Sequence, residues 1–245
     1  LHGASPNGLN INDECGATSP DALQELVKAS RADVGIAFDG DGDRLIMADH
    51  CGAVLDGDDI LYIIAQSQLR KLNGAVVGTV MSNLGLEHAI KKLELDFFRA
   101  AVGDRYVMEL LLKNNLILGG ETSGHIINLE LTTTGDGIIA ALQVLESIIL
   151  TGKNLSELTK EISKYPQIVR NIKFDTQIDI TRNDEINLAI KDTENILANT
   201  GRVVLRPSGT ESLIRIMVEG ENENQIETLV DELADKVNKV TTRLH

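Results

Sequence analysis

Basic residues and long apolar runs are scarce in this 245-residue sequence. It has 23 lysines and arginines against 37 aspartates and glutamates, which gives a formal net charge of −14. This excess of negative charge argues against sequence-independent nucleic-acid binding and against anionic membrane surfaces. No run reaches the roughly 18 uncharged apolar residues of a membrane span, and no secretory signal opens the chain. A small anionic ligand would therefore need a local site where basic groups gather.

Cysteine is also rare, and the sequence lacks an initial methionine. The two cysteines, Cys15 and Cys51, form no C-x-x-C pair. This usage favours buried, reduced thiols in a cytoplasmic protein over a disulfide scaffold. The chain begins at Leu1 and runs directly into a loop rich in Gly, Asn and Pro over residues 3–12. We therefore expect a portion of a longer protein.

Short apolar strands alternate with amphipathic helices through the first 120 residues. The alternation of Val34, Ile36 and Phe38 with Gly35 and Ala37 predicts a strand that ends at Asp39. Strands alternating with helices predict an α/β architecture with a largely parallel sheet. The further predicted strands cover residues 75–80, 97–102 and 116–120, and the helices cover residues 19–27, 59–72, 86–93 and 105–114.

The rest of the sequence predicts a second stretch of strands and helices with a different texture. After a strand at 126–131, Thr132, Thr133 and Thr134 offer hydroxyl caps to a long apolar helix over 138–150. From Gln167 onward the pattern is typical of a smaller α+β unit. Before Gln167 we predict a helix capped by Asn154 and running to Ser163. After it we predict a strand at 168–174, a helix at 184–198, two strands around Pro207, and a helix at 223–240.

These patterns predict a multidomain α/β protein with mixed sheets flanked by helices and a smaller α+β C-terminal domain. We place domain boundaries near residues 53 and 166, so that the predicted units are 1–53, 54–166 and 167–245. The first boundary follows the Gly-rich turn at Cys51-Gly52, and the second follows Tyr165-Pro166, where a helix must stop.

The most informative segment is an acidic loop that follows the first strand. Asp39, Asp41 and Asp43 alternate with Gly40 and Gly42, and Arg44 comes next. The glycines let the backbone curl, so three carboxylates can converge on one ion. Oxygen ligands alone select a hard cation, Mg²⁺ or Ca²⁺. An EF-hand also begins D-x-D-x-D, but here loop position 6 is Arg44, position 12 is His50, and a strand precedes the loop where an EF-hand has a helix.

Two later segments are suited to binding a sugar and an anion. Glu121, Ser123 and His125 lie in the run Gly119-Gly120-Glu121-Thr122-Ser123-Gly124-His125, where a carboxylate and a hydroxyl can bind vicinal sugar groups. Arg206-Pro207-Ser208-Gly209-Thr210-Glu211, followed by Arg215, offers hydroxyls, backbone N–H groups and guanidinium groups to a phosphate. An ordinary turn is the alternative interpretation for each segment.

In this order, the acidic loop, Gly120-Glu121-Thr122-Ser123-Gly124-His125, Thr133-Thr134-Gly135-Asp136-Gly137 and residues 206–211 resemble the α-D-phosphohexomutase superfamily across essentially the whole chain. Residues 102–107 and 208–211 resemble its bacterial phosphoglucosamine mutase branch more than the phosphomannomutase or phosphoglucomutase branches. The resemblance implies a four-domain enzyme, of which this chain holds the end of domain 2 and all of domains 3 and 4. Domain 1, with its phosphorylated serine, would be missing, so the chain alone should be inactive.

The resemblance also implies an activity and a role for each motif. The intact enzyme would interconvert glucosamine 6-phosphate and glucosamine 1-phosphate through a bisphosphate intermediate, as a cytoplasmic protein that serves amino-sugar and cell-wall precursor synthesis, with a homodimer as its candidate assembly. Its only partner would be the phosphosugar, without nucleic acid or membrane. The implied roles are Asp39, Asp41 and Asp43 as ligands of Mg²⁺, Arg44 as a catalytic cation, and Glu121, Ser123, His125, Arg206, Ser208, Gly209, Thr210 and Arg215 as substrate-binding residues.

Two alternatives stay open at this point. The first is a phosphomannomutase or phosphoglucomutase, because residue types alone do not determine which group at C2 of the sugar is bound. The second is a non-catalytic module that binds a sugar phosphate with the help of a cation such as Ca²⁺.

Overall fold

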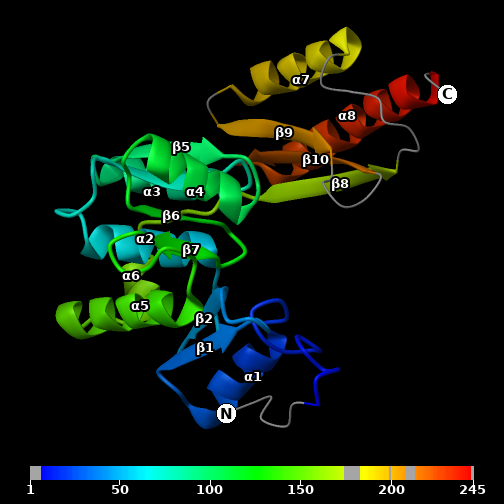
Figure 1. Cartoon of the computed structure of the whole chain (residues 1–245). Helices are drawn as coiled ribbons and strands as arrows, with labels where there is room; N and C mark the ends of the chain where they lie inside the picture. Colours follow the sequence, from blue (N-terminus) through cyan, green and yellow to red (C-terminus); the bar gives the residue numbers. More distant parts are fainter. Residues whose placement is uncertain (1–6, 174–182, 199, 208–212, 244–245) are drawn as a thin grey trace. The chain divides into compact units, whose positions relative to one another are not determined.

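The computed structural model describes residues 7–173, 183–198, 200–207 and 213–243 (Figure 1). The chain divides into two compact units, Leu1–Ser163 and Lys164–His245, and each is considered by itself. Across the described ranges, none of the helices combines the length and the apolar character that a bilayer crossing requires.

The N-terminal unit begins with a three-stranded antiparallel sheet that carries the acidic loop. Its strand order is β1-β2-β3, and helix α1 packs against β1. Phe38 pairs with Leu45, so residues 39–44 form the loop that joins two hydrogen-bonded strands. The elements are α1 (Asp21–Ser30), β1 (Val34–Phe38), β2 (Leu45–Asp49) and β3 (Val54–Leu55).

A second, mixed sheet of order β5-β4-β6-β7 occupies the rest of this unit. Strand β4 runs parallel to β5 and β6, whereas β7 runs antiparallel to β6. Neighbouring residues of β4 point to opposite faces: Val76 joins the apolar cluster around α2, and Val77 joins the cluster under α4. The elements are α2 (Gly57–Ser67), β4 (Ala75–Thr79), α3 (Leu84–Lys92), β5 (Asp96–Ala100), α4 (Asp104–Lys113), β6 (Leu118–Gly120), β7 (Ile126–Asn128), α5 (Gly137–Thr151) and α6 (Leu155–Leu158).

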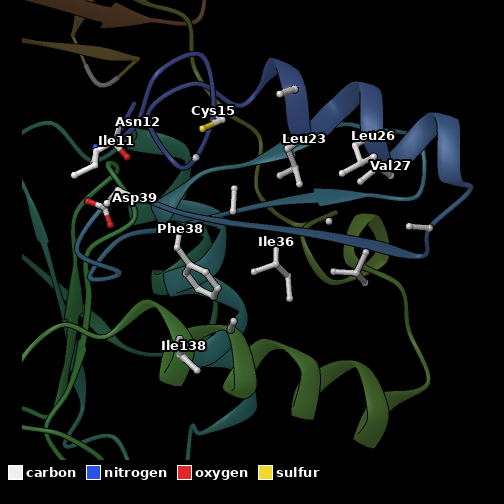
Figure 2. Close-up of a pocket in the computed structure, with 18 of the residues that line it drawn as sticks. Ile11, Asn12, Cys15, Leu23, Leu26, Val27, Ile36, Phe38, Asp39 and Ile138 are labelled. Atoms are coloured by element: carbon white, nitrogen blue, oxygen red, sulfur yellow. The ribbon is translucent and has the colours of Figure 1, made fainter. Parts of the chain in front are cut away.

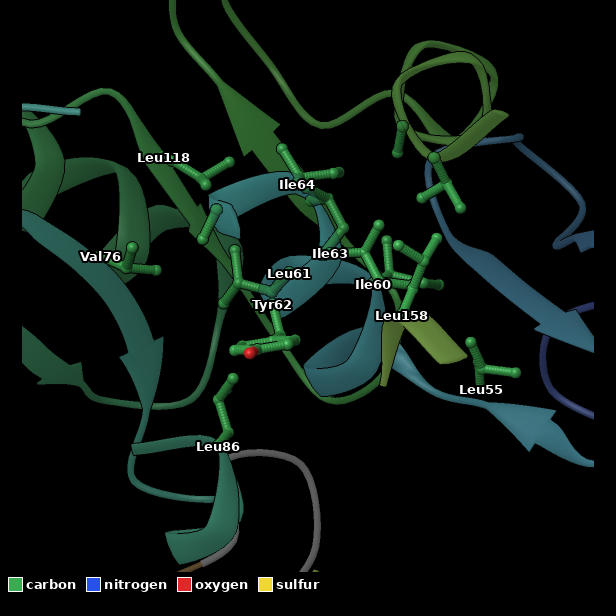
Figure 3. Close-up of a cluster of buried hydrophobic side chains, with 14 of the residues drawn as sticks. Leu55, Ile60, Leu61, Tyr62, Ile63, Ile64, Val76, Leu86, Leu118 and Leu158 are labelled. Carbon is green, nitrogen blue, oxygen red and sulfur yellow. The ribbon is translucent and has the colours of Figure 1, made fainter. Parts of the chain in front are cut away.

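Helix α2 is the centre of the main core. Asp56 caps its first turn, and Asp56 and Asp59 form a reciprocal capping box. Residues 57–65 are all buried, so the helix is enclosed on every side. Figure 3 shows Leu61 and its neighbours among side chains from β4, α3, β6, β3 and α6.

The C-terminal unit is a three-stranded antiparallel sheet with two helices. Its order is β8-β10-β9, and its core is a separate apolar cluster that draws on both helices and on β10. The elements are β8 (Gln167–Lys173), α7 (Asp184–Leu197), β9 (Gly201–Pro207), β10 (Leu213–Gly220) and α8 (Glu223–Arg243). The predicted class, mixed sheets flanked by helices with a smaller α+β C-terminal unit, is confirmed.

Several local predictions were wrong. Strand β2 was missed, because all five of its residues are buried and it shows no alternation. The cap of α5 is Asp136, whose carboxylate accepts the N–H of Ile139, and not a threonine. The helix capped by Asn154 ends at Leu158, well before Ser163. Neither thiol is buried: Cys51 is exposed and Cys15 is half-buried, although both are free.

The enclosure of α2 leads to a stability prediction. Leu61→Ala should lower the free energy of unfolding by about 2–5 kcal/mol, because it leaves a cavity in a close-packed core. Leu112→Ala, on a side chain that is 66% exposed, should change it by less than about 0.5 kcal/mol. Urea denaturation of both variants measures the difference, and equal values would contradict the central place of α2.

Candidate functional site

The acidic loop brings its three carboxylates together. Gly42 has a φ of 76°, and its N–H donates to the carbonyl of Asp39 at 3.2 Å, which closes the loop into a turn. Asp39, Asp41 and Asp43 each offer a carboxylate oxygen, and these oxygens all lie within 4.8 Å of one another. The convergence predicted from the sequence spacing is therefore present.

Arg44 lies beside the first of these carboxylates. Its backbone N–H donates to Asp39 Oδ1 at 3.0 Å, and its Nε lies 3.6 Å from Asp39 Oδ2. The Asp39 side chain is only 5% exposed, whereas that of Arg44 is 45% exposed. The guanidinium group thus combines an anchored Nε with access to solvent, and it can meet an anion that approaches the loop.

The surroundings of the Asp43 carboxylate are the most direct evidence for a bound cation. One carboxylate oxygen, Oδ2, lies 2.9 Å from Nδ1 of His125. The other oxygen, Oδ1, is buried and has no hydrogen-bond partner among the described residues. Burying a carboxylate oxygen without a partner is costly, so a solvated acidic turn does not account for it. A hard cation fits this set of oxygens.

The loop between β6 and β7, residues 121–125, is joined directly to the acidic loop. Leu45 N–H donates to the Gly124 carbonyl at 3.0 Å, and Arg44 forms an isolated antiparallel bridge with His125. Gly124 has a φ of 97°, and a Cβ on it would overlap the carbonyl oxygen of Leu45. Only glycine allows this approach, so the two predicted loops form one site in the N-terminal unit.

The three residues predicted to bind a sugar do not share one surface. Ser123 is exposed and Glu121 is half-buried. Glu121 Oε1 accepts the N–H of Gly103 at 2.9 Å, which draws the loop that begins α4 to the same place. The His125 side chain is buried and faces Asp43.

Asp58 supports this loop and was not predicted to do so. Its side chain, 1% exposed, accepts a hydrogen bond from Thr122 Oγ1 at 3.1 Å and another from the N–H of Asn83 at 2.7 Å. The sequence pattern at residues 57–59 predicts only the start of a helix. The signal was a second carboxylate two residues after the capping Asp56, since only one is needed as the cap.

The anion-binding segment is described only in part. Ser208, Gly209 and Thr210 lie outside the described residues. In the C-terminal unit, Arg206 and Arg215 are opposite each other on β9 and β10. Burial, and then the charge of Arg215, lower the pKa of the Arg206 guanidinium. Nε of Arg206 is buried with no partner in the part of the chain that the structure describes, while Arg215 Nε donates to Asn171.

An apolar groove of about 1050 Å³ lies beside the acidic loop (Figure 2). Its walls come from the loop over residues 10–16, α1, β1 and α5, with Leu23, Ile36, Phe38 and Ile138 among the lining side chains. Asp39 is at its rim. The side chains from α1, β1 and α5 that line it are largely apolar, so this part of the groove suits polypeptide side chains better than a phosphosugar.

Comparison with protein families agrees with the order of these motifs. Three family models of phosphoglucomutase/phosphomannomutase match in succession: α/β/α domain II over residues 4–52, α/β/α domain III over 56–165, and the C-terminal domain over 169–236. The chain belongs to the α-D-phosphohexomutase superfamily.

The chain is also similar to individual proteins of that superfamily. The chain is 54% identical to a phosphoglucosamine mutase of Nitrosococcus oceani and 53% identical to one of Methylococcus capsulatus, in each case over 96% of its own length. It spans only about half of these relatives, 52% and 53%. The structure resembles Aspergillus fumigatus N-acetylphosphoglucosamine mutase in complex with GlcNAc-6P and magnesium, with a TM-score of 0.72 and 20% identity over 92% of this chain and 57% of that one.

The contact at Gly124 generates a prediction. Gly124→Ala should destabilise the phosphohexomutase chain by at least about 1 kcal/mol more than Gly74→Ala, because both positions have positive φ but only Gly124 faces a backbone carbonyl. Thermal or urea unfolding of the two variants measures the difference. Equal destabilisation would show that the junction of the two loops is not closely packed.

The facing side chains of Arg206 and Arg215 lead to a second prediction for this site, on phosphate binding. Inorganic phosphate at 100 times its dissociation constant should stabilise the wild type by about 2.7 kcal/mol. Arg206→Leu should abolish most of this effect, yet cost little stability without phosphate, since it removes an Nε that has no partner within the described ranges and a repulsion with Arg215. Arg170→Leu, which breaks a half-exposed ion pair with Asp231, is the control. An undiminished phosphate effect in Arg206→Leu would rule out this site.

Proposed function

We propose that the chain is a portion of a phosphoglucosamine mutase, which interconverts glucosamine 6-phosphate and glucosamine 1-phosphate through a bisphosphate intermediate. The main support is Oδ1 of Asp43, which is buried and has no partner in the described part of the chain. It lies among three converging carboxylates, on a loop joined to the turn that carries Glu121 and Ser123. The similarity to phosphoglucosamine mutases supports the choice of sugar.

Each motif has a role in this proposal. Asp39, Asp41 and Asp43 hold Mg²⁺, which would supply charge neutralisation for the transferring phosphoryl group. The magnesium in the Aspergillus fumigatus complex supports this choice of cation. Arg44 adds positive charge beside the phosphoryl group, and its solvent-exposed guanidinium is free to reach the ligand.

The remaining residues orient the substrate. Glu121 and Ser123 hydrogen-bond the sugar, with Glu121 held in place by Gly103. Arg206 and Arg215, with Ser208, Gly209 and Thr210, bind the phosphate that is not reacting. A substrate held at its distant phosphate and at its hydroxyls can present either of its ends to the metal loop, which is what a mutase requires.

We also propose that the chain works as three domains, 1–53, 54–166 and 167–245, and that upstream sequence supplies domain 1 and the phosphoserine donor. The three successive family-model matches support the division, and the chain's share of its relatives' length, about half, is consistent with a further domain. The 245-residue chain by itself would then bind the cation and the phosphosugar without turnover. The intact enzyme would act in the cytoplasm.

The direct test is mutase turnover. The full-length enzyme should convert glucosamine 6-phosphate faster than mannose or glucose 6-phosphate, and Asp41→Asn should lower this activity by about 100-fold or more, since loss of a direct ligand exceeds the cost of a supporting one. Asp96→Asn, an exposed carboxylate on β5, is the control. Turnover by the 245-residue chain alone would contradict an upstream donor, and full activity of Asp41→Asn would contradict the metal site.

The apolar groove fits the same division. Strand β1 is at an edge of its sheet, where the Phe38 carbonyl accepts the N–H of Ala17, and a sheet edge beside apolar side chains is a place where another strand adds. If upstream sequence completes this sheet, the β1 amides that point away from β2 should exchange more slowly in the full-length enzyme than in the 245-residue chain. Amides of α3 are the control. Protection that instead rises with the concentration of the shorter chain would indicate a second copy in the groove.

A further inference from the structure

Three polar side chains form one row across the sheet of the C-terminal unit. Arg215 on β10 is directly opposite Asn171 on β8 and Arg206 on β9. Directly opposite residues of neighbouring strands point to the same face of a sheet. The next residues on two of these strands, Ile172 and Ile214, belong to the apolar cluster with α7 and α8. The three polar residues, the arginine row, therefore lie on the face away from the helices.

Within the arginine row, Asn171 is hydrogen-bonded to one of the two cations. Arg215 Nε donates to Oδ1 of Asn171 at 3.0 Å. A guanidinium group has no acceptor, so the amide atom that faces it must be the carbonyl oxygen. Arg215 is thus held by a neutral group. Its positive charge, and that of Arg206 on its other side, have no counter-charge within the row.

A second row on the same face shows how this sheet neutralises an arginine. Glu219, four residues after Arg215 on β10, is opposite Gln167 on β8 and Arg202 on β9. The Glu219 side chain is 0% exposed, and its two oxygens accept hydrogen bonds from Gln167 Nε2 and Arg202 Nε. Each row therefore takes an amide from β8 and an arginine from β9.

The two rows differ only in the residue that β10 contributes. A carboxylate, Glu219, stands between the amide and the arginine in one row, and a second arginine, Arg215, stands there in the other. In the arginine row, Nε of Arg206 is buried and has no partner among the described residues. Two guanidinium groups with no carboxylate between them suit an external anion such as phosphate.

We propose that Asn171 is a positioning residue of the phosphate site: it fixes the Arg215 guanidinium beside Arg206 and, being neutral, leaves both positive charges to the anion. This inference rests on the proposed phosphate-binding role of the two arginines. A carboxylate at position 171 would hold Arg215 as well as the amide does, but it would compete with the anion for the guanidinium group. The amide combines anchoring with anion binding.

Titration of the 245-residue chain with inorganic phosphate, without added metal, tests the proposal. The Nε–H signals of Arg206 and Arg215 report binding by NMR. Asn171→Asp should lower the phosphate affinity by about 10-fold or more, because the new carboxylate pairs with Arg215. For the same reason it should raise the unfolding temperature without phosphate by about 1–5 °C. A purely structural role would not give opposite effects on stability and affinity.

Two further substitutions at position 171 separate the hydrogen bond from the charge. Asn171→Leu removes the acceptor and should lower the phosphate affinity by about 3- to 10-fold. Asn171→Gln keeps a neutral acceptor and should stay within about twofold of the wild type. The control is Asn238→Asp at an exposed position of α8, which adds the same charge on the helix side of the sheet and should also stay within about twofold.

The outcomes separate this inference from the proposed function. A folded Asn171→Asp variant with wild-type phosphate affinity, or one that loses no more affinity than Asn238→Asp, overturns the positioning role alone. If Asn171→Asp does not fold, wild-type affinity of Asn171→Leu overturns it instead. Absence of a phosphate-dependent shift of both arginine signals in the wild type, or unchanged affinity of Arg206→Leu, overturns the phosphate site and this inference with it.

Discussion

The site depends on one backbone junction, where Leu45 donates to Gly124 and Arg44 bridges to His125. These contacts join the end of the acidic loop to the turn that carries Glu121 and Ser123. Because the junction uses main-chain groups, it holds the two loops together and leaves their side chains available to bind a ligand. The cost is a glycine with positive φ at position 124, whose missing Cβ lets the strands meet.

The net negative charge of the chain makes its local basic groups important for binding an anion. A chain with a net charge of −14 repels anions in general, so any small anionic ligand must be held through local basic groups. Arg44 lies at the acidic loop, and Arg206 and Arg215 face each other across two strands of the other unit. Two guanidinium groups placed so close together, one with a buried Nε that has no partner among the described residues, are unfavourable unless an anion joins them.

The sequence predicted the elements of the fold well where periodicity was clear, and it failed where burial erased it. Strand β2 has no polar side to alternate with, and the two antiparallel sheets depend on hairpin pairing that composition does not encode. Spacing predicted the convergence of Asp39, Asp41 and Asp43. It could not show that His125 turns inward or that Asp58 supports the neighbouring turn, because both facts depend on contacts between segments far apart in the chain.

The most direct test of the account is paramagnetic broadening of backbone amide signals by Mn²⁺. If the acidic loop and the turn at 121–125 form one metal-centred site, substoichiometric Mn²⁺ should broaden the amides of residues 40–44 together with those of Gly124 and His125. Asp49, His50 and Cys51 also lie close enough to one another to bind a metal, and they provide the contrast. Broadening centred on residues 49–51, with residues 124 and 125 unaffected, would contradict the account.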